Sequence, residues 1–178
     1  MRLAGTAQVS SVDGPGLRFV IFTQGCLHQC PHCQNKDSWD VNGGEEFSVK
    51  QVVRMLKKQE KKLRGVTFSG GEPFLQAAEL AETALAARKL GWDVVTYTGF
   101  TYEELLDDNS GGVNDLLSAS DILIDGKFIY ELRDPKLQFR GSSNQRIIDV
   151  AATQKSGRIV LWNEKGKKHL DKTPAAVL

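Results

Sequence analysis

The chain has 178 residues, of which 40% are hydrophobic, so it suits one globular domain with a sizeable core and excludes two full catalytic domains. Its 23 Lys and Arg against 22 Asp and Glu leave a net charge of +1, so the composition does not favour a nucleic-acid binder. The N-terminus has no apolar signal region, and no stretch approaches the roughly 18 apolar residues that span a bilayer. We therefore expect a cytoplasmic protein with no nucleic-acid or membrane partner.

Strands and helices are predicted to alternate along the chain. A buried strand over residues 17–23 is followed by a loop that holds all the cysteines, and then by an amphipathic helix that starts at a Ser48–Gln51 capping box and whose apolar period continues to Leu63. The remaining predicted elements are a strand over 65–69, a helix from Pro73 to Leu90, a strand over 92–98, a capping box at Thr101–Glu104, a helix around Leu116 and Leu117, and strands over 121–125, 147–150 and 158–162. Such alternation predicts an α/β fold whose mostly parallel sheet is either open or curled into part of a barrel.

Three cysteines, Cys26, Cys30 and Cys33, lie within eight residues in a C-x3-C-x2-C pattern. An odd number of crowded thiols argues against a disulfide framework and indicates a soft-metal site, for zinc or an iron–sulfur cluster. Three thiolates do not fill a four-ligand shell. Either His28 or His32 completes a structural zinc site, or the fourth position stays open for an exogenous ligand, as in catalysis. The spacing alone favours neither.

Each of the first four predicted strands ends in an unusual loop, and parallel topology places these loops together at the carboxyl edge of the sheet, where ligands bind. The loops are the cysteine loop (Cys26–Cys33), Gly70-Gly71-Glu72, Thr98-Gly99 and Asp125-Gly126-Lys127. Two glycines let backbone approach a ligand closely, and an acidic side chain beside them suits an ammonium group. These loops form the predicted site.

The cysteine spacing after a first strand resembles the signature of the radical S-adenosylmethionine (SAM) enzymes. The resemblance implies that Cys26, Cys30 and Cys33 hold three irons of a 4Fe-4S cluster while SAM chelates the open fourth iron. An electron from the cluster would cleave SAM to methionine and a 5′-deoxyadenosyl radical, with the cofactor supplying the radical chemistry. No separate protein acid or base is assigned. Ser69-Gly-Gly-Glu-Pro73 resembles the GGEP motif of the same superfamily.

A narrower resemblance covers nearly the whole chain. The stretch from Asp13-Gly-Pro-Gly-Leu-Arg18 to Trp39 is similar to the glycyl-radical-enzyme activases, and the stretches 97–105 and 139–146 are similar to those that activate anaerobic ribonucleoside-triphosphate reductase. The resemblance implies a single radical SAM domain over 1–178, with a core of about 14–150 and a C-terminal extension over 151–178. Its fold would be an incomplete TIM-type barrel with outer helices.

The same resemblance implies the residues that bind SAM. They are His32, Gln34, Gly70, Gly71, Glu72, Thr98, Asp125 and Lys127, with Arg140, Asn144 and Arg146 as further contacts to SAM or to the partner. His32 departs from many relatives, which carry a hydrophobic or aromatic residue near the adenine. Thr98-Gly99 departs from the Thr-Asn-Gly of the pyruvate formate-lyase activator and disfavours that assignment.

The resemblance implies a large glycyl radical enzyme as partner, preferably the anaerobic ribonucleotide reductase, and an electron donor such as flavodoxin. Activation of another glycyl radical enzyme, such as pyruvate formate-lyase, is the nearest alternative. A zinc or iron–sulfur interaction or sensor protein without SAM chemistry is the alternative from another class. We expect His28 and His169 at the surface, and the lysine run 57–62 to form a solvated helix face or a donor-docking face.

Overall fold

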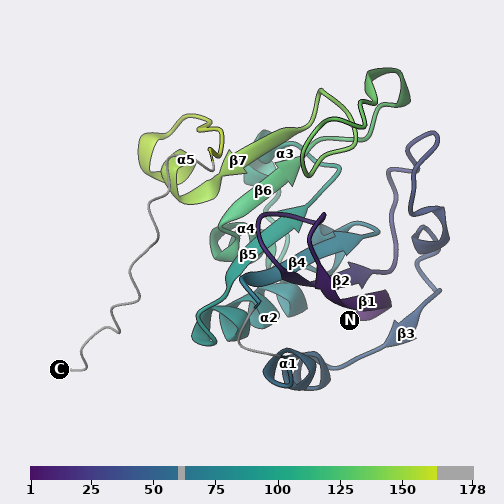
Figure 1. Cartoon of the computed structure of the whole chain (residues 1–178), viewed down its shortest axis with the longest axis vertical. Coiled ribbons are helices and arrows are strands. Elements are labelled where there is room, and N and C mark those ends of the chain that lie inside the picture. Colours follow the sequence, from purple (N-terminus) through teal and green to yellow (C-terminus); the bar gives the residue numbers. More distant parts are fainter. Residues whose placement is uncertain (60–62, 164–178) are drawn as a thin grey trace.

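The computed structural model describes residues 1–59 and 63–163, and within them a single seven-stranded sheet runs in the order β3-β1-β2-β4-β5-β6-β7 (Figure 1). The strands are β1 (Arg2–Ser10), β2 (Arg18–Thr23), β3 (Glu45–Glu46), β4 (Gly65–Gly70), β5 (Asp93–Tyr97), β6 (Ile122–Asp125) and β7 (Arg146–Asp149). The central strands β2, β4, β5 and β6 are parallel. Strands β1, β3 and β7 flank them in antiparallel pairs.

The sheet is open, because its outer strands β3 and β7 do not pair with each other in the described chain. This agrees with the expected mixed α/β architecture and with a barrel that does not close. The antiparallel flanks were not predicted. They arise because the chain reaches these strands without an α-helical crossover, which a parallel pair requires.

The helices are α1 (Val49–Lys57), α2 (Ala77–Lys89), α3 (Tyr102–Asp107), α4 (Val113–Ala119) and α5 (Val150–Ser156). Helices α1 and α3 begin at the predicted capping boxes, whereas the helix expected from Pro73 begins as an α-helix only at Ala77. Ser48 and Gln51 cap α1 reciprocally, and Thr101 and Glu104 do the same for α3, so both predicted capping boxes are confirmed. Pro73 starts a short 3-10 turn that leads into α2.

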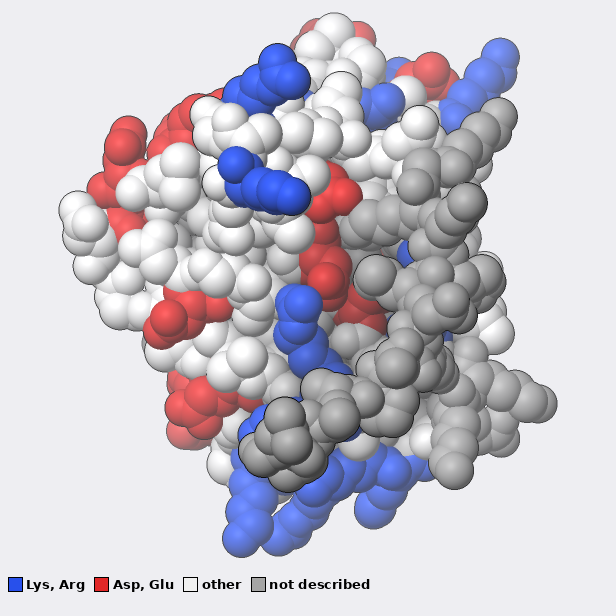
Figure 2. Space-filling model, turned by 90° about the vertical axis from the view of Figure 1, so that its left-hand side faces the viewer, with Lys and Arg blue, Asp and Glu red and all other residues white. Residues whose placement is uncertain are grey.

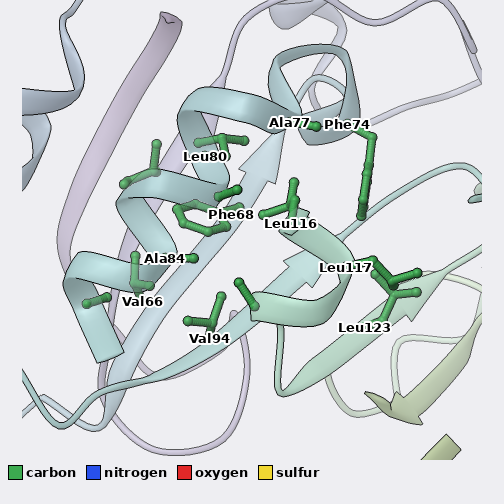
Figure 3. Close-up of a cluster of buried hydrophobic side chains, with 14 of the residues drawn as sticks. Val66, Phe68, Phe74, Ala77, Leu80, Ala84, Val94, Leu116, Leu117 and Leu123 are labelled. Atoms are coloured by element: carbon green, nitrogen blue, oxygen red, sulfur yellow. The ribbon is translucent and has the colours of Figure 1, made fainter. Parts of the chain in front are cut away.

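One face of the sheet packs against α1, α2 and α4 and forms the main core. Figure 3 shows Val66, Phe68 and Val94 of the strands beneath Leu80 of α2 and Leu116 of α4, all essentially inaccessible to solvent. Fully burying such a side chain stabilises the fold by roughly 1.5–3 kcal/mol. The opposite face carries a smaller apolar cluster around Val95, Ile122 and Ile124. Helices α1, α2 and α4 therefore do not cover the second face, where loops and the site lie.

Several local predictions differ from the structure. The N-terminal strand β1 and the short β3 were not predicted, and Leu63 lies beyond the end of α1. Residues 151–156, expected as a polar link, belong to α5 (Val150–Ser156), because the Asp149 side chain caps the helix by accepting from the Ala152 amide. Residues 158–162, expected as a strand, contribute only an isolated bridge from Leu161 to Ile148.

Several sequence expectations fall wholly or partly outside the described residues. They concern Lys61 and Lys62 of the lysine run, His169, and the part of the C-terminal extension that follows Asn163. Among the residues that are described, no helix combines the length and the apolar character that a membrane crossing requires.

Candidate functional site

The predicted loops meet at the carboxyl edge of the parallel strands. The amide of Gly71 donates to the Thr23 carbonyl at 2.8 Å, and the amide of Glu72 donates to the Gly25 carbonyl at 2.8 Å. A Cβ on Gly71 would lie 2.3 Å from the Gly25 carbonyl oxygen, so only glycine allows this close approach. The glycine pair therefore holds the end of β4 directly against the start of the cysteine loop.

The cysteine loop leaves β2 and returns along the same edge, where the Cys26 amide donates to the Trp39 carbonyl at 3.1 Å. All three cysteines are free thiols of intermediate exposure, and Gln29 and His32 between them adopt left-handed backbone conformations. In the described part of the chain, no three Cys, His, Asp or Glu side chains are gathered around a metal position. The donor set nevertheless fits a cluster, because three free thiols on one short loop are the ligands that iron–sulfur clusters take.

Cys26 is half-buried and lies close to the Glu72 carboxylate. Burial raises the pKa of the Cys26 thiol, and the nearby Glu72 carboxylate adds to the increase. A raised pKa means that the free thiol keeps its proton at neutral pH, and binding of a metal must displace that proton.

Glu72, expected to receive an ammonium group, is 1% exposed, and protein groups surround its carboxylate. Its Oε1 accepts from the Phe74 amide at 3.0 Å and from the Thr98 hydroxyl at 2.9 Å. Its Oε2 accepts from the Gly99 amide at 2.8 Å and lies 2.9 Å from His28 Nε2. The carboxylate thus joins the loops that follow β2, β4 and β5.

The expectation that His28 is a surface side chain was wrong. Its side chain is only 10% exposed, contacts Glu72 and packs edge-on against the Phe100 ring at a centroid distance of 4.5 Å. His32, in contrast, is exposed, and its ring lies 4.2 Å from that of Tyr130. Because a surface histidine and a buried one have the same sequence signal, only the fold separates the two.

Asp125 ends β6 and is 1% exposed, like Glu72. Its carboxylate accepts from the Tyr102 amide at 2.8 Å and pairs with the Arg146 guanidinium, whose Nε lies 3.0 Å from Oδ1. Arg146 also reaches Glu103 with both terminal nitrogens, at 3.0 and 2.6 Å, and thereby lowers the pKa of Glu103. This network ties β6, β7 and the first turn of α3 together.

Replacement of Arg146 by alanine is expected to leave the buried Asp125 carboxylate with a lone amide partner. The free energy of unfolding should fall by about 2 kcal/mol, because charged hydrogen bonds to a buried group are lost. For the SAM-binding role that the family resemblance implies, SAM affinity and partner activation should each fall by about tenfold as the loop after β6 loosens. Chemical unfolding, SAM titration and an activation assay measure these separately, with Glu103→Ala as the control that keeps the Asp125 pair. Unchanged SAM affinity and activation would contradict this role.

The remaining predicted contacts lie on the loop that folds back over β6 and β7. Arg140 donates to the Gln145 carbonyl at 2.6 Å, and Asn144 donates to the Lys127 carbonyl at 2.9 Å. The Lys127 side chain itself is exposed. The 139–146 stretch therefore closes on the Asp125–Lys127 loop as one unit.

A cavity of about 440 Å³ lies between the cysteine loop and this folded-back segment. Its lining includes Cys33, Gln34, Ser69, Tyr97, Phe139 and Arg140. The cysteine loop and the 126–141 segment stand at the same end of the sheet in Figure 1. Among the predicted site residues, Cys33, Gln34 and Arg140 line the cavity, whereas Glu72, Thr98 and Asp125 are buried and do not line it.

Tyr97 is a cavity residue to which sequence reasoning gave no role. Burial raises its pKa, so the phenol stays protonated and donates to the Phe139 carbonyl at 2.7 Å. That carbonyl belongs to a residue held in a left-handed conformation, which is strained for a side chain of this size. The position of Tyr97 at the end of a parallel strand was the available signal.

Residues 12–148 match the protein family described as "4Fe-4S single cluster domain". This match covers most of the chain and includes all three cysteines. The fold and the site thus define a protein of the class that carries one 4Fe-4S cluster.

Sequence similarity to known proteins identifies the family within this class. The anaerobic ribonucleoside-triphosphate reductase-activating protein of Escherichia coli K12 is 34% identical over 145 residues, which cover 77% of this chain and 91% of that protein. The Vibrio cholerae protein of the same name is 37% identical over 146 residues, or 78% and 92% of the two chains. The pyruvate formate-lyase 1-activating enzyme of Escherichia coli K12 is 33% identical over 169 residues, covering 90% of this chain but 65% of its own. The chain belongs to the family of anaerobic ribonucleoside-triphosphate reductase-activating proteins.

Proposed function

We propose that this protein is a radical SAM activase that generates a glycyl radical on an anaerobic ribonucleoside-triphosphate reductase. The observation that carries the proposal is the cysteine loop at the carboxyl edge of the sheet, which holds three free thiols and places Cys33 in the cavity wall, in a chain of the activating-protein family. Family membership favours the iron–sulfur interpretation over a structural zinc site with His28 or His32 as fourth ligand.

In this proposal Cys26, Cys30 and Cys33 hold the 4Fe-4S cluster and leave one iron open to SAM. When bound, the reduced cluster and SAM supply a 5′-deoxyadenosyl radical that removes one hydrogen atom from the partner's glycine. The exposed side chains of His32, Gln34 and Lys127 and the backbone of Gly70-Gly71 contact SAM. Glu72, Thr98 and Asp125 support it from beneath, because their polar atoms face protein groups.

A backbone glycine of a protein is a target that this cavity can admit. The sheet is open and the cavity is bounded by loops, so an extended segment of a partner can enter beside Cys33. Glycine has no Cβ to obstruct that approach. Arg140 and the neighbouring Arg133 on the cavity wall offer donors to such a segment.

An electron donor such as flavodoxin would have to reach the cysteine-loop end of the molecule. The basic side chains of α1 lie elsewhere: Figure 2 shows Lys and Arg gathered at the lower end, where Figure 1 places α1. The chain passes from α1 to the amino end of β4, opposite the carboxyl edge that bears the site. This basic face is therefore a solvated helix face in our proposal, and the protein acts in the reducing cytoplasm, where its thiols stay free.

Anaerobic incubation of the reconstituted protein with reductant, SAM and candidate partners tests the proposal. We expect a glycyl radical signal by electron paramagnetic resonance on the anaerobic reductase. Omission of SAM should remove the signal.

A signal on pyruvate formate-lyase but not on the reductase would favour the alternative partner. A colourless protein that binds stoichiometric, air-stable zinc would overturn the proposed chemistry in favour of a structural zinc protein.

A further inference from the structure

The His28 side chain packs against the loops that follow β4 and β5. Its Nε2 lies 2.9 Å from Glu72 Oε2, and its ring meets Phe100 edge-on. Beneath the ring is Gly99, where an added Cβ would lie 2.3 Å from the imidazole Cδ2 and 2.6 Å from Nε2. Any residue larger than glycine at position 99 would therefore clash with the His28 imidazole.

The environment of His28 differs sharply from that of its neighbours. Leu27 is 71% exposed and Gln29 is exposed with a left-handed backbone, whereas the His28 side chain is 10% exposed. In the described chain, His28 is the only residue from Cys26 to Cys33 whose side chain hydrogen bonds to a loop that follows another strand. The first turn of the cysteine loop is therefore attached to the sheet through one side chain.

The acceptor of this bond is itself rigid. Glu72 receives the Phe74 and Gly99 amides and the Thr98 hydroxyl, so its carboxylate cannot turn away without leaving buried donors unpaired. A buried, fully hydrogen-bonded carboxylate that orients a ligand-bearing loop is the arrangement by which proteins hold metal ligands from outside the coordination shell.

We propose that His28 is a positioning residue that anchors the segment between Cys26 and Cys30 to Glu72 and so presets these two thiols for cluster binding. Glu72 acts on the cluster loop through His28, and Gly99 is required because the imidazole lies against it. The effect on the cluster rests on the proposed function, whereas the anchoring of the loop does not.

The test compares His28→Leu, which removes the bond, with His28→Gln, whose amide can still donate to Glu72. Gly99→Ala displaces the ring from the other side, and Leu27→Ala is the control in the same loop. In the metal-free protein, hydrogen exchange of the 26–33 amides should be faster in His28→Leu and Gly99→Ala than in wild type, His28→Gln or Leu27→Ala. Thermal unfolding verifies that each variant is folded.

After anaerobic reconstitution, iron release to a chelator should be roughly 10- to 100-fold faster in His28→Leu and Gly99→Ala, as for other residues that orient metal ligands. The electron paramagnetic resonance spectrum of the reduced cluster should change in the same two variants and be restored in His28→Gln. Wild-type exchange and iron retention in His28→Leu would overturn the inference. If wild type takes up no iron, the proposed function fails, and hydrogen exchange alone decides whether His28 anchors the loop.

Discussion

Replacement of Cys30 by alanine is expected to abolish both cluster binding and SAM cleavage. Cys30 lies in the middle of the cysteine loop, and the chain has no fourth cysteine that could replace it. The variant should therefore be colourless after anaerobic reconstitution, contain little iron and sulfide, and produce no detectable 5′-deoxyadenosine. Cys26→Ala and Cys33→Ala should behave alike, since each removes one of the same three ligands.

Leu27→Ala provides a control because Leu27 lies in the same loop but is 71% exposed and carries no donor atom. It should load iron and cleave SAM as wild type does. Retained SAM cleavage in the Cys30→Ala protein would contradict the assignment of the ligands. Loss of iron together with loss of folding, seen by circular dichroism, would instead point to a structural metal.

Replacement of Arg18 by methionine is expected to have the largest effect on stability. Its guanidinium is fully buried, donates to the Thr67 hydroxyl at 2.7 Å and to the Val66 carbonyl at 2.7 Å, and pairs with Asp93 at 2.6 Å. Burial lowers the pKa of Arg18, but the side chain remains charged. Methionine fills most of the volume and leaves these partners unpaired, so the free energy of unfolding should fall by about 3–5 kcal/mol.

Arg64→Met is the matched control, because Arg64 contacts the same Asp93 carboxylate at 2.8 Å from a side chain that is 39% exposed. Its loss should lower the free energy of unfolding by less than about 1 kcal/mol. Urea unfolding of the metal-free proteins measures both values, and the melting temperature of Arg18→Met should fall by roughly 10 °C. Equal effects of the two variants would show that burial of Arg18 does not determine its contribution.

Arg18 also connects the sheet to the site. Its Nη1 donates at 3.0 Å to the carbonyl of Pro15, in the turn that follows Asp13. Asp13 lines the cavity, and its carbonyl accepts from Thr67 at 2.8 Å. The buried Arg18 guanidinium, at the amino end of the strands, thus holds Pro15 directly and Asp13 through Thr67. In this way the motif from Asp13 to Arg18 positions a residue of the cavity wall.

The elements predicted correctly are those whose signal is local. The central strands carry apolar, β-branched runs, and the capping boxes at Ser48 and Thr101 need only residues three apart. Strand β1 was not predicted because its sequence, Arg-Leu-Ala-Gly-Thr-Ala-Gln-Val-Ser, has little apolar alternation and depends on pairing with β2. Helix α5 was missed because it is short and becomes stable only through its cap and its packing.

The cysteine spacing, the alternation of strands and helices and the loops that follow the strands can all be read from the sequence, and together they predict the edge of the sheet where the site lies. The direction in which the polar side chains at that edge face depends on the packing of distant segments. Glu72 and His28 are 44 residues apart, and Asp125 and Arg146 are 21 apart. The partner of a buried polar group is set by whichever distant segment packs against it, and residue spacing along the chain carries no information about that contact.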